Sequence, residues 1–164
     1  MAEVTIRGNP VHTSGELPSV GSSAPSFTLT GADFGNVESG GFEGKNVVIN
    51  IFPSIDTPTC ATSVRTFNER AAGLDDTVVL CVSADLPFAQ NRFCGAEGIE
   101  NVTTASTFRS GFGADYGVTL VDGPLAGVLA RAVVVVGPDG SVKHTELVGE
   151  IGQEPDYDAA LGSI

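Results

Sequence analysis

Three short runs of apolar residues constrain the fold of this chain more than any other feature. Residues 47–52, 78–83 and 132–136 are almost continuously apolar and contain many β-branched side chains. Runs of this length and composition are typical of strands that are buried on both faces of a sheet. Because such a sheet must be covered on each side, the runs predict an α/β fold in which helices pack on both faces of a mixed sheet.

The segment after the first run predicts a helix. From Pro58 onward, apolar residues recur at spacings of three and four, at Val64, Phe67, Ala71 and Leu74. This spacing places them on one face of an α-helix, which can then pack against the sheet. The order of strand, helix and second strand supports the α/β interpretation.

Weaker patterns predict the remaining elements. The first fourteen residues alternate in polarity and turn at Gly8-Asn9-Pro10, which is typical of a β-hairpin. Helices are expected at residues 86–93 and 107–112 and from Glu154 onward, and further strands at 27–29, 101–105 and 141–147. No internal repeat or linker interrupts the chain, so residues 1–164 are expected to form a single domain.

The charge of the chain argues against two classes of partner. Twenty acidic residues against eight basic ones give a formal net charge of −12. A surface of this sign repels phosphate groups and anionic lipid heads, so neither nucleic acid nor a membrane is an expected partner. The N-terminal residues lack the basic segment and apolar stretch of a secretory signal. We therefore expect a cytoplasmic protein.

The cysteines and histidines argue against a disulfide scaffold and against a metal site. There are three cysteines, an odd and low number for a secreted scaffold. They form no C-x-x-C pair, and His12 and His144 lack the spacing of a metal site or a catalytic dyad. The sequence therefore predicts neither a metal nor another cofactor. Cys81 lies inside the second apolar run and is expected to be an inert core residue.

The loop after the first apolar run places another cysteine at the start of a helix. Thr57 is a favoured N-cap residue, and Pro58 suits the first helical position. This register puts Cys60 in the first turn, where unpaired N–H groups and the positive end of the helix dipole favour a thiolate. The residues alone leave two interpretations open: a reactive thiol, or a cysteine that packs at a helix start.

The same loop resembles the active-site signature of peroxiredoxins. Pro53, Thr57 and Cys60 form the pattern P-x-x-x-T-x-x-C. Residues 50–69, 83–94 and 129–133 are similar to the thiol peroxidase subfamily of atypical two-cysteine peroxiredoxins, and the likeness covers nearly the whole chain. It implies a thioredoxin-like fold, with a mixed central sheet, helices on both faces and an N-terminal β-hairpin.

The resemblance also implies a role for five residues. Cys60 would be the peroxidatic cysteine, which a peroxide oxidises to a sulfenic acid. Thr57 would hydrogen-bond the thiolate and the peroxide, while Pro53 would shield the pocket. Arg131 would aim its guanidinium at Cys60. Cys94 would be the resolving cysteine, which condenses with the sulfenic acid to an intrachain disulfide.

Substrates and partners follow from the same resemblance. It implies reduction of hydrogen peroxide and alkyl hydroperoxides, recycling by thioredoxin or a similar dithiol, and a homodimer. Two other family positions for a resolving cysteine are excluded here, because Arg65 stands five residues after Cys60 and no cysteine follows Cys94.

Two other functions use the same residues differently. A disulfide exchanger of the thioredoxin type would need C-x-x-C, but Thr57 occupies the position three before Cys60. A redox sensor that passes its oxidation to a protein partner needs only the two cysteines that the peroxidase needs. The sequence leaves this alternative open, and measurement of thioredoxin-coupled peroxide turnover separates the two.

Overall fold

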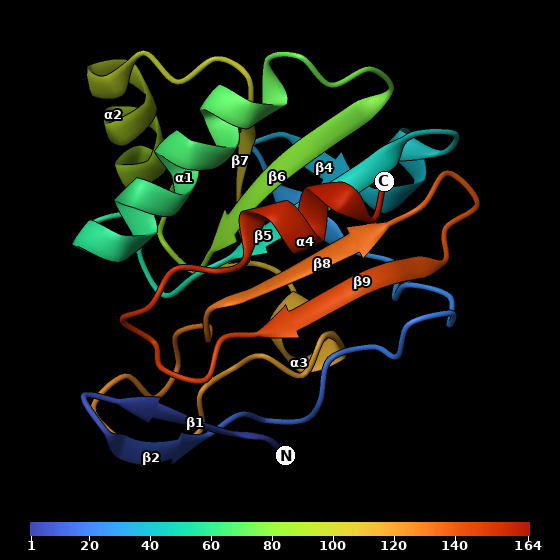
Figure 1. The fold of residues 1–164 in the computed structure, drawn as a ribbon. Helices are drawn as coiled ribbons and strands as arrows, with labels where there is room; N and C mark the ends of the chain where they lie inside the picture. Colours follow the sequence, from blue (N-terminus) through green and yellow to red (C-terminus); the bar gives the residue numbers. More distant parts are fainter.

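A computed structural model describes residues 1–164 and is built on a seven-stranded mixed sheet (Figure 1). The strand order is β4-β3-β7-β6-β5-β8-β9. The strands are β3 (Thr28–Thr30), β4 (Asn36–Glu38), β5 (Asn46–Ile51), β6 (Thr77–Ser83), β7 (Thr103–Ser106), β8 (Ala132–Val136) and β9 (Val142–Leu147). The three apolar runs form β5, β6 and β8, which are neighbours at the centre, as their composition predicts.

Helices cover both faces of this sheet, as expected, although unequally. The helices are α1 (Pro58–Ala71), α2 (Pro87–Glu97), α3 (Phe112–Asp115) and α4 (Tyr157–Gly162), with a 3₁₀ turn η1 at Ser39–Phe42. Apolar residues of α1, α2 and α4 pack in one core cluster, whereas α3 contributes to the cluster on the opposite face (Figure 1). Alternate residues of β5 enter the two clusters, Val48 on the first side and Ile49 on the second. None of these helices is long and apolar enough to cross a membrane.

The structure corrects several of the expected boundaries. Helix α2 continues to Glu97, beyond the expected end at residue 93. The helix expected at residues 107–112 is absent, and α3 begins only at Phe112. The hydroxyls of Ser106 and Ser110 accept hydrogen bonds from amides two residues later, which favours turns over a helix. Strand β4 and the η1 turn were not expected, because both are short and neither has a buried side chain.

The N-terminal hairpin is confirmed, with its turn displaced. It consists of β1 (Glu3–Ile6) and β2 (Asn9–His12), which form a separate antiparallel pair (Figure 1). The turn is at Arg7 and Gly8, with φ angles of 50° and 82°. Two positive φ angles match the twist of the flanking strands, so the tightest connection uses these two residues rather than Gly8-Asn9-Pro10.

Two carboxylates attach this hairpin to the rest of the chain. At one end, Asp122 accepts hydrogen bonds from the backbone amide of His12 and from its ring Nδ1, both at 2.7 Å. At the other end, Glu150 binds the turn at Gly8. Between them, Val4 and Val11 are buried in a small apolar cluster. The hairpin is therefore held by polar contacts at its ends and by apolar packing in the middle.

We expect the contribution of His12 to stability to depend on pH. The hydrogen bond to Asp122 raises the pKa of His12, and the same contact lowers the pKa of Asp122. The stabilisation by His12 is therefore complete below the unfolded value of about 6.5 and is lost as pH rises through the higher folded value. The melting temperature of His12→Gln should lie further below that of the unmodified protein at about pH 5.5 than at about pH 8.5. An equal difference in melting temperature at both pH values would contradict the stabilising role of the protonated His12.

Candidate active site

Cys60 lies in the first turn of α1, at the carboxyl end of β5. Thr57 has the extended backbone of an N-cap residue (φ −106°, ψ 147°), and Pro58 opens the helix. The expected register is therefore confirmed, and Cys60 is the third helical residue. Its side chain is fully buried, at 0% exposure. A nucleophile at this place has the positive end of the helix dipole beneath it.

The strand order brings Arg131 to this cysteine. Strands β5 and β8 are antiparallel, and Ile51 at the end of β5 pairs with Ala132 at the start of β8. Arg131 immediately precedes β8 and is 71 residues from Cys60 in sequence, yet its Nη2 lies 3.2 Å from the Cys60 Sγ. Arg131 is almost fully buried, at 2% exposure. A cation in this position stabilises a thiolate.

The other two nitrogens of the Arg131 guanidinium differ in their contacts. Its Nε donates to the carbonyl oxygen of Ile151 at 2.8 Å, which fixes the direction of the guanidinium plane. Its Nη1 is buried and has no hydrogen-bond partner in the protein. A buried unpaired donor on a cation is costly unless a ligand binds it. The guanidinium therefore holds the sulfur with one nitrogen and keeps another donor free.

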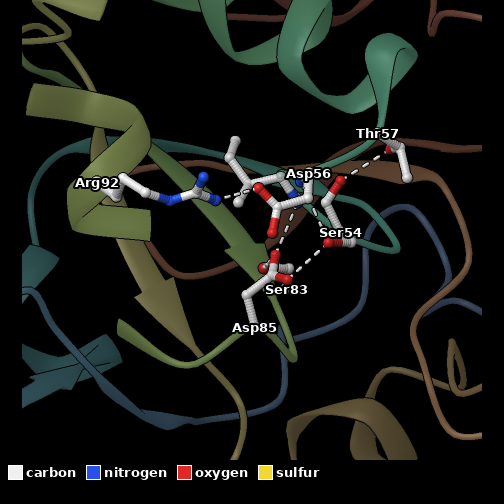
Figure 2. A network of polar contacts seen from close by, with 7 residues as sticks. Ser54, Asp56, Thr57, Ser83, Asp85 and Arg92 are labelled. Carbon is white, nitrogen blue, oxygen red and sulfur yellow. Dashed lines mark hydrogen bonds and ion pairs between the residues drawn. The ribbon is translucent and has the colours of Figure 1, made fainter. Parts of the chain in front are cut away.

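Asp85 fixes the loop between β5 and α1 (Figure 2). Its Oδ1 accepts from the Ser54 hydroxyl at 2.7 Å, and its Oδ2 accepts from the amide of Ile55 at 2.7 Å and from the Ser83 hydroxyl at 2.6 Å. Our sequence interpretation did not identify Asp85. One signal was available: Ser83 ends a buried strand and Asp85 follows it, and the carboxyl ends of neighbouring parallel strands share one edge of the sheet.

Pro53 and Thr57 also belong to this loop, and the structure places them differently. Pro53 is buried, whereas Thr57 is exposed. The Thr57 hydroxyl donates to the carbonyl oxygen of Ser54 at 2.8 Å, as drawn in Figure 2, and makes no capping hydrogen bond. A hydroxyl has a single proton, so in this arrangement Thr57 can accept a further hydrogen bond but cannot donate one to Cys60.

Cys94 lies in the last turn of α2 and is not bonded to Cys60. All three cysteines are free thiols. Cys94 is half-buried, and burial raises the pKa of its thiol. It follows the first residue of α2, Pro87, by seven positions, which corresponds to about 10 Å along the helix. Cys60 is instead in the first turn of its own helix, so the two cysteines occupy opposite ends of their helices.

The end of α2 is closed on the backbone of Cys94. Gly98 adopts a left-handed conformation (φ 64°), and the amides of Gly98 and Ile99 both donate to the Cys94 carbonyl oxygen. Only glycine adopts this conformation at little cost. On the loop side, Arg92 of α2 forms an exposed ion pair with Asp56, so α2 and the Cys60 loop are joined (Figure 2).

Cys81 is separate from this chemistry. It is buried in β6, and burial raises its pKa to about 12, so it stays protonated near neutral pH. Its sulfur accepts from the Asn50 side-chain amide at 3.8 Å. These features agree with the interpretation of Cys81 as a core residue.

Access to the Cys60 sulfur requires a movement of the chain. A half-open cavity of about 340 Å³ lies at the opposite end of the central strands, where Val47, Tyr116 and Val136 line it. Cys60 does not border this cavity and is itself fully covered. A small substrate can therefore contact the sulfur only when the segments around the first turn of α1 open.

Comparison with known proteins identifies the family of this chain. The Redoxin family model matches residues 19–161. The thiol peroxidase of Mycobacterium tuberculosis is 66% identical over 164 residues, which is 100% of this chain and 99% of that protein. The thiol peroxidase of Corynebacterium glutamicum is 57% identical over the same shares.

Among solved structures, a peroxiredoxin-like protein from Aquifex aeolicus superimposes with a TM-score of 0.94 at 42% identity. The match covers 99% of this chain and 95% of that chain. Both the sequence and the fold are therefore shared over essentially the full length. The chain belongs to the Redoxin family and, within it, to the thiol peroxidase subfamily of the peroxiredoxins.

Proposed function

We propose that Cys60 is the residue that this peroxidase uses to attack the peroxide. Its thiolate sulfur forms a bond to one peroxide oxygen while the O–O bond breaks, which oxidises the sulfur to a sulfenic acid. The second oxygen leaves as hydroxide or alkoxide and takes a proton to become water or an alcohol. The observation that carries the proposal is the distance of 3.2 Å between the Cys60 Sγ and the Arg131 Nη2.

Arg131 supplies the charge stabilisation in this step. Negative charge moves from the sulfur to the leaving oxygen as the O–O bond breaks, and fixed donors aimed at that oxygen lower the barrier. The buried Nη1 of Arg131 has no partner in the protein and can donate to the peroxide. Thr57 keeps an acceptor for the peroxide O–H, and buried Pro53 keeps water from the sulfur.

Cys94 completes the cycle as the resolving residue. Its thiolate attacks the Cys60 sulfur and the S–OH bond breaks, which forms a Cys60–Cys94 disulfide. The hydroxide that leaves takes up a proton and becomes water. A dithiol protein such as thioredoxin then supplies the two electrons that restore both thiols. The expected substrates are hydrogen peroxide and alkyl hydroperoxides.

We also infer that the enzyme works in the cytoplasm as a homodimer. Exposed aromatic surface supports the homodimer, since Phe34 and Phe88 are solvent-accessible and pack with ring centroids 5.0 Å apart.

Coupled turnover tests this function against that of a redox sensor. The protein should consume hydrogen peroxide continuously with thioredoxin, its reductase and NADPH, and should stop after one equivalent without them. Peptide mapping after one equivalent should recover a Cys60–Cys94 disulfide and a free Cys81. A single oxidation with no coupled turnover would favour the sensor, and a disulfide to Cys81 would overturn the assignment of Cys94.

We expect disulfide formation to unfold two segments locally. Cys94 is in the last turn of α2 and Cys60 in the first turn of α1, whereas a disulfide needs Cα atoms about 4.4–6.8 Å apart. Amide exchange should therefore increase at residues 57–64 and 92–98 in the oxidised protein, while β5 stays protected. Equal protection of both segments in the two redox forms would show that the thiols reach each other without unfolding.

A further inference from the structure

The segment at residues 149–152 binds Arg131 and Thr59, the residue next to Cys60. The carbonyl oxygen of Ile151 accepts the hydrogen bond from the Arg131 Nε at 2.8 Å. The carbonyl oxygen of Gly152 accepts one from the hydroxyl of Thr59, the residue before Cys60, at 3.1 Å. The segment belongs to no helix or strand, so its position depends on what binds it.

The N-terminal hairpin binds this segment, in part through the side chain of Glu150. The Oε1 of Glu150 accepts from the amide of Gly8 at 2.9 Å and from the Thr5 hydroxyl at 3.0 Å. Its Oε2 accepts from the amide of Gly152 at 3.0 Å. The carboxylate therefore connects the turn of the hairpin to the residue that follows Ile151.

Backbone contacts reinforce the same connection. The amide of Thr5 donates to the carbonyl oxygen of Gly149 at 2.8 Å, and the amide of Ile151 donates to the carbonyl oxygen of Thr5 at 2.9 Å. Ile151 is also buried against Val4 of the hairpin. Amides that donate to Glu150, first that of Gly152 and then that of Gly8, lower the pKa of its side chain, so the charged form holds these contacts.

We propose that Glu150 is a positioning residue, which orients the Arg131 guanidinium toward Cys60 by fixing the Ile151 carbonyl. The proposal rests on the roles of Cys60 and Arg131 given above. An arginine held at Nε by a fixed acceptor has little freedom to rotate its Nη atoms, so the Nη2 stays on the sulfur. Loss of Glu150 frees the Ile151 carbonyl to shift, and small shifts in a reacting geometry have large effects on rate.

The other attachment of the hairpin provides a matched control. Asp122 also binds the hairpin through a carboxylate, which accepts hydrogen bonds of 2.7 Å from His12, but it has no hydrogen bond to residues 149–152. Asp122→Asn should therefore loosen the hairpin without moving Arg131. A role of Glu150 in stability alone would give the same result in both variants.

The test compares Glu150→Ala, Glu150→Gln, Asp122→Asn and Arg131→Met with the unmodified protein. Two quantities are measured: the rate of Cys60 oxidation by hydrogen peroxide in stopped flow, and the pH midpoint of Cys60 alkylation, followed by mass spectrometry. Glu150→Ala should slow oxidation about tenfold and move the alkylation midpoint to higher pH, because the thiolate loses part of its cationic partner. Glu150→Gln keeps one amide oxygen as an acceptor and should be intermediate.

Asp122→Asn should leave both quantities unchanged while lowering the melting temperature. The inference is overturned if the Glu150 variants match the unmodified protein while Arg131→Met is impaired. It is also overturned if Asp122→Asn slows oxidation as much as Glu150→Ala. An unimpaired Arg131→Met would instead remove the proposed role of Arg131, and the inference with it.

Discussion

Cys60→Ser should abolish peroxide consumption. A serine hydroxyl stays protonated near neutral pH, and its oxygen cannot form the oxidised intermediate that a sulfur forms. The fold should persist, because the buried hydroxyl would still accept the hydrogen bond that Arg131 gives to the sulfur. Peroxide consumption in the thioredoxin-coupled assay measures the effect, and the melting temperature verifies folding.

Cys81→Ser is the matched control for this substitution. It also replaces a fully buried thiol by a hydroxyl, and the Asn50 amide that binds the Cys81 sulfur can bind the new oxygen. Most of the activity should therefore remain. Normal turnover by Cys60→Ser, or complete loss in a folded Cys81→Ser, would refute the assignment of the reactive cysteine.

Arg131→Met should slow the attack on peroxide by one or more orders of magnitude, as removal of a transition-state donor typically does. Methionine fills a similar volume but has neither the charge nor the donors that Arg131 offers to Cys60 and to the leaving oxygen. The stopped-flow rate of Cys60 oxidation measures the effect separately from recycling by the reductant.

Two further measurements distinguish a catalytic role of Arg131 from a structural one. The substitution leaves the Ile151 carbonyl without its partner, so the melting temperature must accompany the rate. Arg131→Lys restores the charge without the planar fork that binds two acceptors at once, and should recover only part of the rate. An unaltered rate in Arg131→Met would show that the arginine has a structural role alone.

The parts of the fold that were predictable are those with a strong local pattern. The apolar runs identified β5, β6 and β8, since strands buried on both faces have no polar positions to obscure them. The register of Cys60 in α1 followed from Thr57 and Pro58, because cap preferences act within one turn. Strand β4 and α3 were missed or misplaced, since each spans four residues or fewer.

The contacts between distant residues could not be read from these patterns. The nearness of Arg131 to Cys60 was expected only from the family resemblance, and its cause is the antiparallel pairing of β5 with β8. Asp85 and Glu150 bind loops 30 and 142 residues away in sequence. The hydroxyl of Thr57 donates to the carbonyl oxygen of Ser54, because this nearby acceptor competes for its proton. Which acceptor a hydroxyl binds depends on the conformation of the folded loop.

The left-handed cap at Gly98 affects the equilibrium between two conformations of the reduced enzyme, one with Cys94 inside the last turn of α2 and one with Cys94 outside it. Moving Cys94 out of the last turn of α2 breaks the hydrogen bonds that Gly98 and Ile99 give to its carbonyl. At about 1 kcal/mol each, the loss of these two bonds alone limits the open population to roughly 3% or less. In the proposed cycle, oxidation of Cys60 then captures a minority conformer that already exists, and reduction of the disulfide returns the chain to the capped majority.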